Sequence, residues 1–325
     1  MKNANMRQDE ERRRHRDEIQ RGNAPSGVDA RQLGGEIDRQ FGPYEGVIGR
    51  VGSAYQNPFA TYLSGVVYEL NGELDDALID YREAYRMAPN AVVGTDFARL
   101  AKALHRDDAL EDLKLRPASG PPPPAGNTLV LVDDGFAPRR VELKFPIPEP
   151  HTVLFVAVPM SQPVPSDLRE TQVVGADGAV VGDTRVLVDV EAIAMRNLRD
   201  RYPAILARQA ARVAGKAAAA WAAEDNLGTG GFLLTTAFNA ITEQADLRGW
   251  YALPRAIQVA RVALPEGATE VRLRFLGAGG GLTRELTAPV VRVTPHMNLV
   301  VVRYLNGNVT ASAPGEPPAL HAGRQ

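Results

Sequence analysis

Apolar residues recur at two different periods along the chain, and the change of period divides the sequence into two parts. Between residues 57 and 104 they repeat at intervals of three and four, which predicts helices. From residue 128 onward the period falls to two, which predicts strands. Between the two parts, residues 115–126 contain four consecutive prolines and predict a stiff, extended linker.

Residues 57–90 predict a helix, a tight turn and a second helix. Asn57 suits the cap of the first helix and Pro58 its first position. Asn71-Gly72 interrupts the apolar run, and Pro89 ends the second helix. We expect small side chains at the contact between the two helices: Gly65, Ala77 and Ala84.

This helix pair resembles a tetratricopeptide (TPR) repeat. Seven residues fall on the pattern of that repeat: Gly65, Tyr68, Gly72, Ala77, Tyr81, Ala84 and Pro89. In TPR proteins the first helix supplies the concave, ligand-binding face. The resemblance therefore implies a protein-binding groove lined by Phe59, Tyr62, Val66 and Glu69.

A single repeat of this kind does not bury its own apolar face. We therefore expect residues 1–56 to be N-terminal helices and a loop, the remnant of a longer helical region. Residues 57–114 would be the TPR-like repeat, with a capping helix over residues 92–104. The charged, uncapped start of the chain suggests a longer reading frame that encodes a signal peptide, a lipid-accepting cysteine and further helices.

The second part, residues 127–305, has the pattern of an antiparallel β-sandwich-like domain. Val271, Leu273 and Phe275 alternate with charged residues, and Asp177-Gly178 is a hairpin turn signal. Residues 190–245 interrupt the strands with an inserted helical hairpin. Pro203 is expected to begin a second helix, residues 226–231 to form a hinge, and residues 232–240 to continue as helix. The tail, residues 306–325, is expected to be disordered. The expected fold class is thus α+β in two parts.

Composition excludes several classes of protein. The 325 residues suffice for about two domains. A net charge of −2 gives no overall basic field for nucleic acid, and the lack of cysteine excludes disulfides and cysteine-based chemistry. The sequence has no run of 18 apolar residues that would span a membrane.

Candidate catalytic and cofactor motifs are weak. The five histidines lie singly, without the spacing of metal ligands. The glycine-rich run at residues 277–281 follows a strand but leads into no helix, so we interpret it as a hairpin loop rather than a dinucleotide site. Asp133-Asp134 is interpreted as a water-facing strand end. We therefore predict no catalytic residue, no metal, no cofactor and no enzyme activity.

Two segments of the insertion leave alternatives open. Arg208, Arg212 and Lys216 form a basic stripe, which is either a solvated helix face or a contact for an anionic partner. Residues 242–253 are interpreted as an ion-pair network in which a buried tryptophan anchors the hairpin, with a recognition site as the alternative. The residues of this network are Glu243, Asp246, Arg248 and Trp250.

The order of three stretches, residues 57–85, 190–220 and 242–267, resembles an uncharacterised family of bacterial envelope lipoproteins. In that family TPR-like helices precede a β-rich domain with an Ala-rich helical insertion, and the likeness covers residues 57–304. The resemblance implies a non-enzymatic, protein-binding scaffold in the periplasm, associated with the outer membrane and linked to cell-wall assembly. The alternatives are a cytoplasmic TPR adaptor and, less well supported, an envelope hydrolase. Partners would be proteins or an anionic envelope surface.

Overall fold

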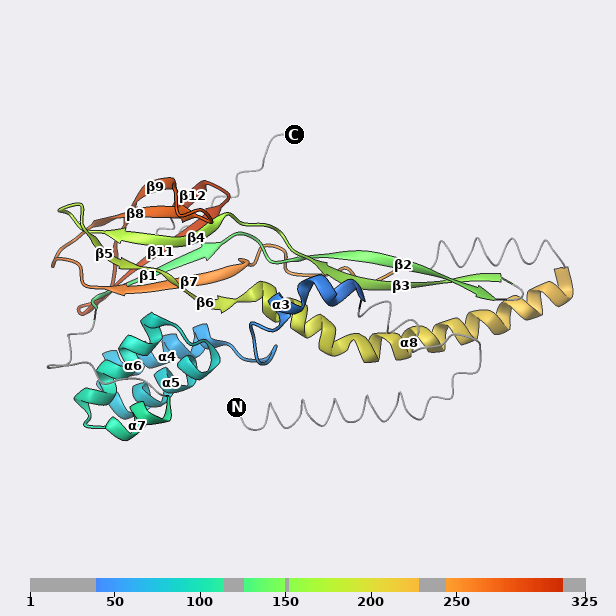
Figure 1. Ribbon diagram of the computed structural model, residues 1–325, viewed down its shortest axis with the longest axis horizontal. Helices are drawn as coiled ribbons and strands as arrows, with labels where there is room; N and C mark the ends of the chain where they lie inside the picture. Colours follow the sequence, from blue (N-terminus) through green and yellow to red (C-terminus); the bar gives the residue numbers. More distant parts are fainter. Residues whose placement is uncertain (1–38, 114–125, 150–151, 228–243, 312–325) are drawn as a thin grey trace. The chain divides into compact units, whose positions relative to one another are not determined.

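The computed structural model describes residues 39–113, 126–149, 152–227 and 244–311 (Figure 1). It confirms a mixed α+β protein, in which N-terminal helices precede a β-rich region with several sheets and one long helix. By their contacts, these residues form two compact units. The first unit consists of residues 39–49, 139–149, 152–162, 194–227 and 244–249. The second consists of residues 50–113, 126–138, 163–193 and 250–311.

The helices of the second unit begin and end where local sequence signals require. They are α4 (Pro58–Leu70), α5 (Leu74–Met87), α6 (Ala91–Ala103) and α7 (Asp107–Asp112). The Asn57 side chain accepts a hydrogen bond from the Ala60 amide at 3.1 Å and caps α4. Asn90 caps α6 in the same way, through the Val93 amide at 3.1 Å. Gly72 has a φ of 82°, which permits the tight turn between α4 and α5.

The second unit also contains two larger sheets. One has the strand order β10-β11-β1-β7-β6, with β12 paired to β11. Its strands are β1 (Thr128–Asp134), β6 (Arg185–Asp189), β7 (Ala256–Val262), β10 (Val291–Thr294), β11 (Met297–Leu305) and β12 (Asn308–Ala311). The other has the order β5-β4-β8-β9. Its strands are β4 (Leu168–Val174), β5 (Val180–Asp183), β8 (Glu270–Gly277) and β9 (Leu282–Pro289).

The expectation of a purely antiparallel arrangement is wrong at one position. Strands β1 and β11 pair in parallel, with Thr128 opposite Asn298 and Asp134 opposite Tyr304. The two strands lie at opposite ends of the β-rich sequence, so no hairpin connects them and nothing forces them to run antiparallel. Both predicted hairpin turns are confirmed. Gly178, with a φ of 84°, lies between β4 and β5, and the glycine-rich run at residues 277–281 joins β8 to β9.

The sheet that contains β1 is the middle layer of the second unit. Leu129 and Leu131 belong to a core shared with the helices, whereas Val130 and Val132 belong to a core shared with β4 and β8. Alternate residues of a strand point to opposite faces, so β1 is buried on both sides. The helices before residue 115 and the sheet after residue 126 are therefore packed together in one unit, and the change in period does not separate two independent cores.

The first unit is built on a two-stranded ribbon, β2 (Arg139–Glu149) and β3 (Thr152–Gln162). It also contains η1 (Gly42–Tyr44), α3 (Glu45–Ile48) and most of α8 (Val190–Leu227). Its core joins Val156 and Val158 of β3 to Met195 and Leu198 of α8. The rings of Phe41 and Tyr202 meet edge to face with centroids 5.0 Å apart.

The prediction that a second helix begins at Pro203 is wrong, because α8 continues through this residue. Proline in a helix interior removes one hydrogen bond and crowds the preceding turn. Here the neighbouring turns are fixed by packing, since Tyr202 donates a hydrogen bond to the carbonyl of Pro159 and Gln209 donates one to Ala157 at 2.8 Å. The helix expected after the hinge, residues 232–240, lies outside the described residues. Residues 244–249 are not helical.

Candidate functional site

A cluster of buried charges lies between the helices and the middle sheet of the second unit. Arg261 projects from β7, and its side chain is 4% exposed. Its guanidinium contacts Glu69 of α4 at 2.9 Å, Asp96 of α6 at 3.1 Å and the hydroxyl of Tyr81 of α5 at 3.0 Å. It also donates to the carbonyl of Gly126 at 3.1 Å. One strand residue thus connects three helices to the sheet.

Four further contacts complete this group. Arg99 contacts Glu69 at 2.6 Å and Asp96 at 3.5 Å, so two guanidinium groups face two carboxylates. Tyr62 donates to Asp96 at 2.7 Å, and Tyr81 donates to Glu69 at 2.7 Å. We call these six residues the Arg261 cluster: Tyr62, Glu69, Tyr81, Asp96, Arg99 and Arg261. Its charges balance, which a buried ionic group requires.

The pKa values of this cluster follow from burial and from these contacts. Burial raises the pKa of Glu69, but the charges of Arg261 and Arg99 and the hydrogen bond from Tyr81 outweigh it, and the pKa lies below its ordinary value. Burial, together with the neighbouring carboxylates, raises the pKa of the Tyr62 and Tyr81 hydroxyls far above their ordinary value. Both tyrosines therefore remain neutral hydrogen-bond donors.

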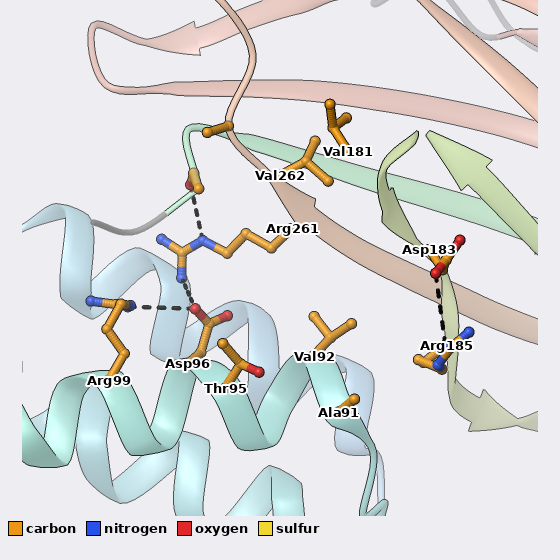
Figure 2. Close-up of a pocket in the computed structure, with 12 residues that line it drawn as sticks. Ala91, Val92, Thr95, Asp96, Arg99, Val181, Asp183, Arg185, Arg261 and Val262 are labelled. Atoms are coloured by element: carbon orange, nitrogen blue, oxygen red, sulfur yellow. Dashed lines mark hydrogen bonds and ion pairs between the residues drawn. The ribbon is translucent and has the colours of Figure 1, made fainter. Parts of the chain in front are cut away.

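A pocket of about 400 Å³ borders this cluster (Figure 2). Asp96, Arg99 and Arg261 lie on one side of it, and Asp183 and Arg185 lie on the other. Three valines lie between the two charged sides: Val92, Val181 and Val262. Its size is within the usual range of small-molecule sites, and it combines two polar ends with an apolar middle.

The predicted protein-binding groove coincides with the packed interior of the second unit. Tyr62 and Val66 are 0% and 4% exposed, and Glu69 contacts Arg261 of the chain's own sheet. Phe59 is half-buried against the same core. Tyr62 and Val66 thus expose almost no surface to a partner, and a binding role for these four residues stays a prediction. The expected small-residue contact is present, because Ala77 and Ala84 are fully buried and Gly65 lies against the Tyr81 ring.

The prediction that Trp250 is a buried packing anchor is wrong, because its side chain is 82% exposed. The segment lies in an extended loop rather than a helix, so its apolar side chains have no helical face to pack against. Asp246 and Arg248 do form the expected ion pair, at 2.9 Å, and hydrogen bonds from Arg248 hold the pKa of Asp246 below its ordinary range. Glu243 lies outside the described residues.

Four exposed apolar side chains gather on two loops of the second unit. They are Phe136, Trp250, Tyr251 and Leu253, which are 38%, 82%, 39% and 42% exposed. The Ala137 amide donates to the Leu253 carbonyl at 2.7 Å, so the two loops lie side by side. Arg303 fixes both, because its guanidinium lies 5.2 Å from the centre of the Phe136 ring and donates to Ala252 at 2.7 Å. We call these four residues the aromatic surface.

The basic stripe is placed only in part. Arg208 and Arg212 are exposed on α8, which fits either a solvated face or an anionic contact. Lys216 lies on the same helix, and its side chain is outside the described residues. The stripe therefore stays a prediction.

Asp134 is not the water-facing residue that its position at a strand end suggested. It is 0% exposed, forms an ion pair with Arg255 of the second unit and accepts a hydrogen bond from Ser166. Arg255 also contacts Glu191 at 3.6 Å. Burial is possible because this guanidinium supplies the compensating charge. Asp133, by contrast, is half-buried, and burial raises its pKa despite the opposing charge of Arg303.

Over the described ranges, no group of three or more His, Asp and Glu side chains is placed to hold a metal ion. In the same part of the chain, no helix is long and apolar enough to cross a membrane. Comparison with known proteins adds nothing to these observations. No protein-family model matches the chain, and neither a curated protein nor a solved structure is significantly similar to it.

Sequence reasoning did not identify Arg261 or Asp96 as partners. Arg261 lies in an apolar strand, next to Ala260 and Val262, and Asp96 lies in a predicted capping helix. A charged residue in the middle of a strand that is otherwise buried on both faces is itself a signal, because such a charge requires a buried partner. That signal indicates that a partner exists but does not say where in the sequence it lies.

Proposed function

We propose that the protein is a non-enzymatic, protein-binding scaffold and that the aromatic surface is its contact site. The observation that carries this proposal is the 82% exposure of Trp250 beside three further exposed apolar side chains. Single exposed apolar residues are common, but groups of large ones mark interaction sites. Tryptophan and tyrosine are also enriched among residues that dominate binding energy at interfaces.

The hydrogen-bonded backbone of the two loops favours a binding role for these side chains over accidental exposure. The hydrogen bonds between residues 137 and 253 and between residues 303 and 252 hold both loops on the ends of β1, β7 and β11. Side chains held in place before binding lose less conformational entropy when they meet a partner. The partner we propose is a protein segment with an apolar face that covers Trp250.

The helices and sheets then serve as the frame for this surface. In this proposal, the helix pair α4–α5 is TPR-like and the packed sheets are sandwich-like, in an envelope lipoprotein of the periplasm. The Arg261 cluster supports a structural use of the helix pair, since Glu69 and Asp96 contact the chain's own strand β7. The proposal therefore places partner binding on the loops rather than on the α4 face.

Affinity capture with the full chain tests this proposal. Partners retained from the cells that produce the protein would be identified by mass spectrometry, purified and titrated against Trp250→Ala and Leu282→Ala. Leu282 is the control, because it is 59% exposed on β9 and is not one of the four residues of the aromatic surface. Loss of a hot-spot side chain weakens binding by about 2 kcal/mol or more, whereas a neutral position changes it little.

The result expected is therefore a loss of affinity in Trp250→Ala alone, with both variants as stable as the parent. Equal affinity for the two variants would overturn the assignment of the contact site. Turnover of a captured protein or of an envelope polymer by the purified chain would overturn the non-enzymatic role.

A further inference from the structure

A second pocket in the second unit, of about 320 Å³, lies beside β6, the strand at one edge of the middle sheet. Its wall is formed by β6 and the start of α8, by residues 50–58 and by the turn between α5 and α6. The apolar part of this wall includes Met87, Pro89, Val186 and Ile193. All four residues are half-buried or exposed, so a molecule in the pocket can contact them.

Part of this apolar wall is not packed into the interior of the protein. Within the described residues, Met87 and Ile193 are half-buried yet belong to none of the three apolar cores. Val186 is 42% exposed. A ligand that covers these side chains removes apolar surface from water, which favours binding. The pocket therefore suits a molecule with an apolar body.

The charged group that a ligand in this pocket can reach is Arg50. Its side chain is 54% exposed, and its Nη1 atom lies 3.3 Å from Oδ2 of Asp189. Because this contact uses Nη1, the edge of the guanidinium formed by Nε and Nη2 remains for a second carboxylate. The spacing of two N–H groups on one edge matches the two oxygens of a carboxylate.

The acidic groups near Arg50 are held by other partners as well. Oδ1 of Asp189 accepts from the Ala192 amide at 2.9 Å, in the first turn of α8, and the Asp189 side chain is only 15% exposed. The positive end of the helix dipole offsets a carboxylate in this position. Glu191 is 8% exposed and contacts Arg255 at 3.6 Å. The positive charge of Arg50 is therefore more open to a ligand than these negative charges are.

We propose that this pocket binds a short aliphatic carboxylate. The carboxylate accepts from Nε and Nη2 of Arg50, and the methylene groups lie against Met87, Val186 and Ile193. A volume of about 320 Å³ is at the lower end of the range of small-molecule sites, which favours a chain of a few carbon atoms over a long one. The site shares no residue with the aromatic surface and does not rest on the function proposed for that surface.

Titration of the full chain with matched six-carbon probes, followed by NMR, tests this proposal. Hexanoate would be compared with hexanamide, which is neutral, and with hexylamine, which carries the opposite charge. We expect hexanoate to bind at least about tenfold more tightly than either, because it alone forms hydrogen bonds between two charged groups at Arg50. Acetate should bind more weakly than hexanoate, by up to about fourfold for each missing methylene group.

Two pairs of variants locate the site. Arg50→Gln should weaken hexanoate by about tenfold or more but leave hexanamide unchanged. Its control is Arg106→Gln, at a side chain that is 47% exposed and also ion-paired, which should change neither. Val186→Trp fills the pocket from β6 and should abolish binding of hexanoate, whereas Val181→Trp on β5, at a position that is also 42% exposed, should not. Circular dichroism establishes that each variant is folded.

Three results would overturn the proposal. Binding of hexylamine or hexanamide as tight as that of hexanoate would show that Arg50 does not recognise a carboxylate. Undiminished binding of hexanoate in folded Arg50→Gln and Val186→Trp would place the ligand elsewhere. Failure of hexanoate to bind the parent at millimolar concentration would refute the site itself.

Discussion

Replacement of Arg261 by methionine is the most informative single change in the frame of the protein. Methionine keeps much of the side-chain length but removes the contacts with Glu69, Asp96, Tyr81 and the carbonyl of Gly126. Two carboxylates then face one guanidinium, that of Arg99, in a site where Glu69 and Asp96 are 11% and 6% exposed. Removal of one partner from a buried ion pair costs about 3–5 kcal/mol. Because whole domains are stable by only about 5–15 kcal/mol, this is a large fraction of the total.

Urea unfolding, followed by circular dichroism, measures this loss, and hydrogen exchange in α4, α5 and α6 assigns it to the second unit. The matched control is Arg272→Met on β8, whose side chain is 44% exposed in its pair with Glu285 and should cost no more than about 1 kcal/mol. Adding Glu69→Gln to Arg261→Met should restore part of the stability, because one carboxylate then faces one guanidinium.

The pH dependence gives an independent check of the same reasoning. The folded pKa of Glu69 is lowered, so its contribution to stability is present above its unfolded pKa of about 4.3 and is lost as the pH falls through the folded value. The difference in the free energy of unfolding between the parent and Arg261→Met should therefore become smaller in acid. A difference below about 1 kcal/mol at neutral pH, or one that does not change with pH, would refute the electrostatic role of this cluster.

Three further predictions follow from other parts of the second unit. Gly65→Ala should destabilise this unit, because the added Cβ would lie 2.8 Å from the Tyr81 ring. Ala84→Leu should lower the free energy of unfolding by about 1–3 kcal/mol, because it overpacks a fully buried contact. An unchanged melting temperature in both variants would contradict the helix packing. Trp250→Ala should change the free energy of unfolding by less than about 0.5 kcal/mol, since the side chain is 82% exposed, and a loss of several kcal/mol in urea unfolding would show that it is packed. Asp133→Asn should raise stability at neutral pH but not in strong acid. Burial raises the folded pKa of Asp133, so its ionisation lowers stability as the pH rises above the unfolded pKa of about 3.9. Equal melting temperatures of variant and parent across the pH range would be evidence against this.

Local features of the fold could be predicted from the sequence because they depend on neighbouring residues. Asn57 at the start of α4, Gly72 at the turn and Gly178 at the hairpin each act within a few positions along the chain. The period of apolar residues likewise marks helices and strands correctly on both sides of residues 115–126. Pro203 is the exception, because packing of α8 on β3 outweighs the local preference.

The candidate sites depend on contacts between distant residues, and the sequence pattern does not contain these. Arg261 meets Glu69 across 192 positions, and Asp134 meets Arg255 across 121. Burial of Trp250 was predicted from its residue type, but the loop that carries it leaves the side chain 82% exposed. The parallel pairing of β1 with β11 is equally non-local, since no short turn connects the two strands.

Site-specific photo-crosslinking most directly tests where this protein meets its partner. A photoreactive amino acid would be placed at position 250 on the aromatic surface and, in a second chain, at position 67 on α4, where Val67 is 55% exposed. After irradiation in the cells that produce the protein, we expect one discrete crosslinked protein from position 250 and none from position 67. The same discrete crosslink from position 67, with none from position 250, would contradict it and return the binding site to the helices.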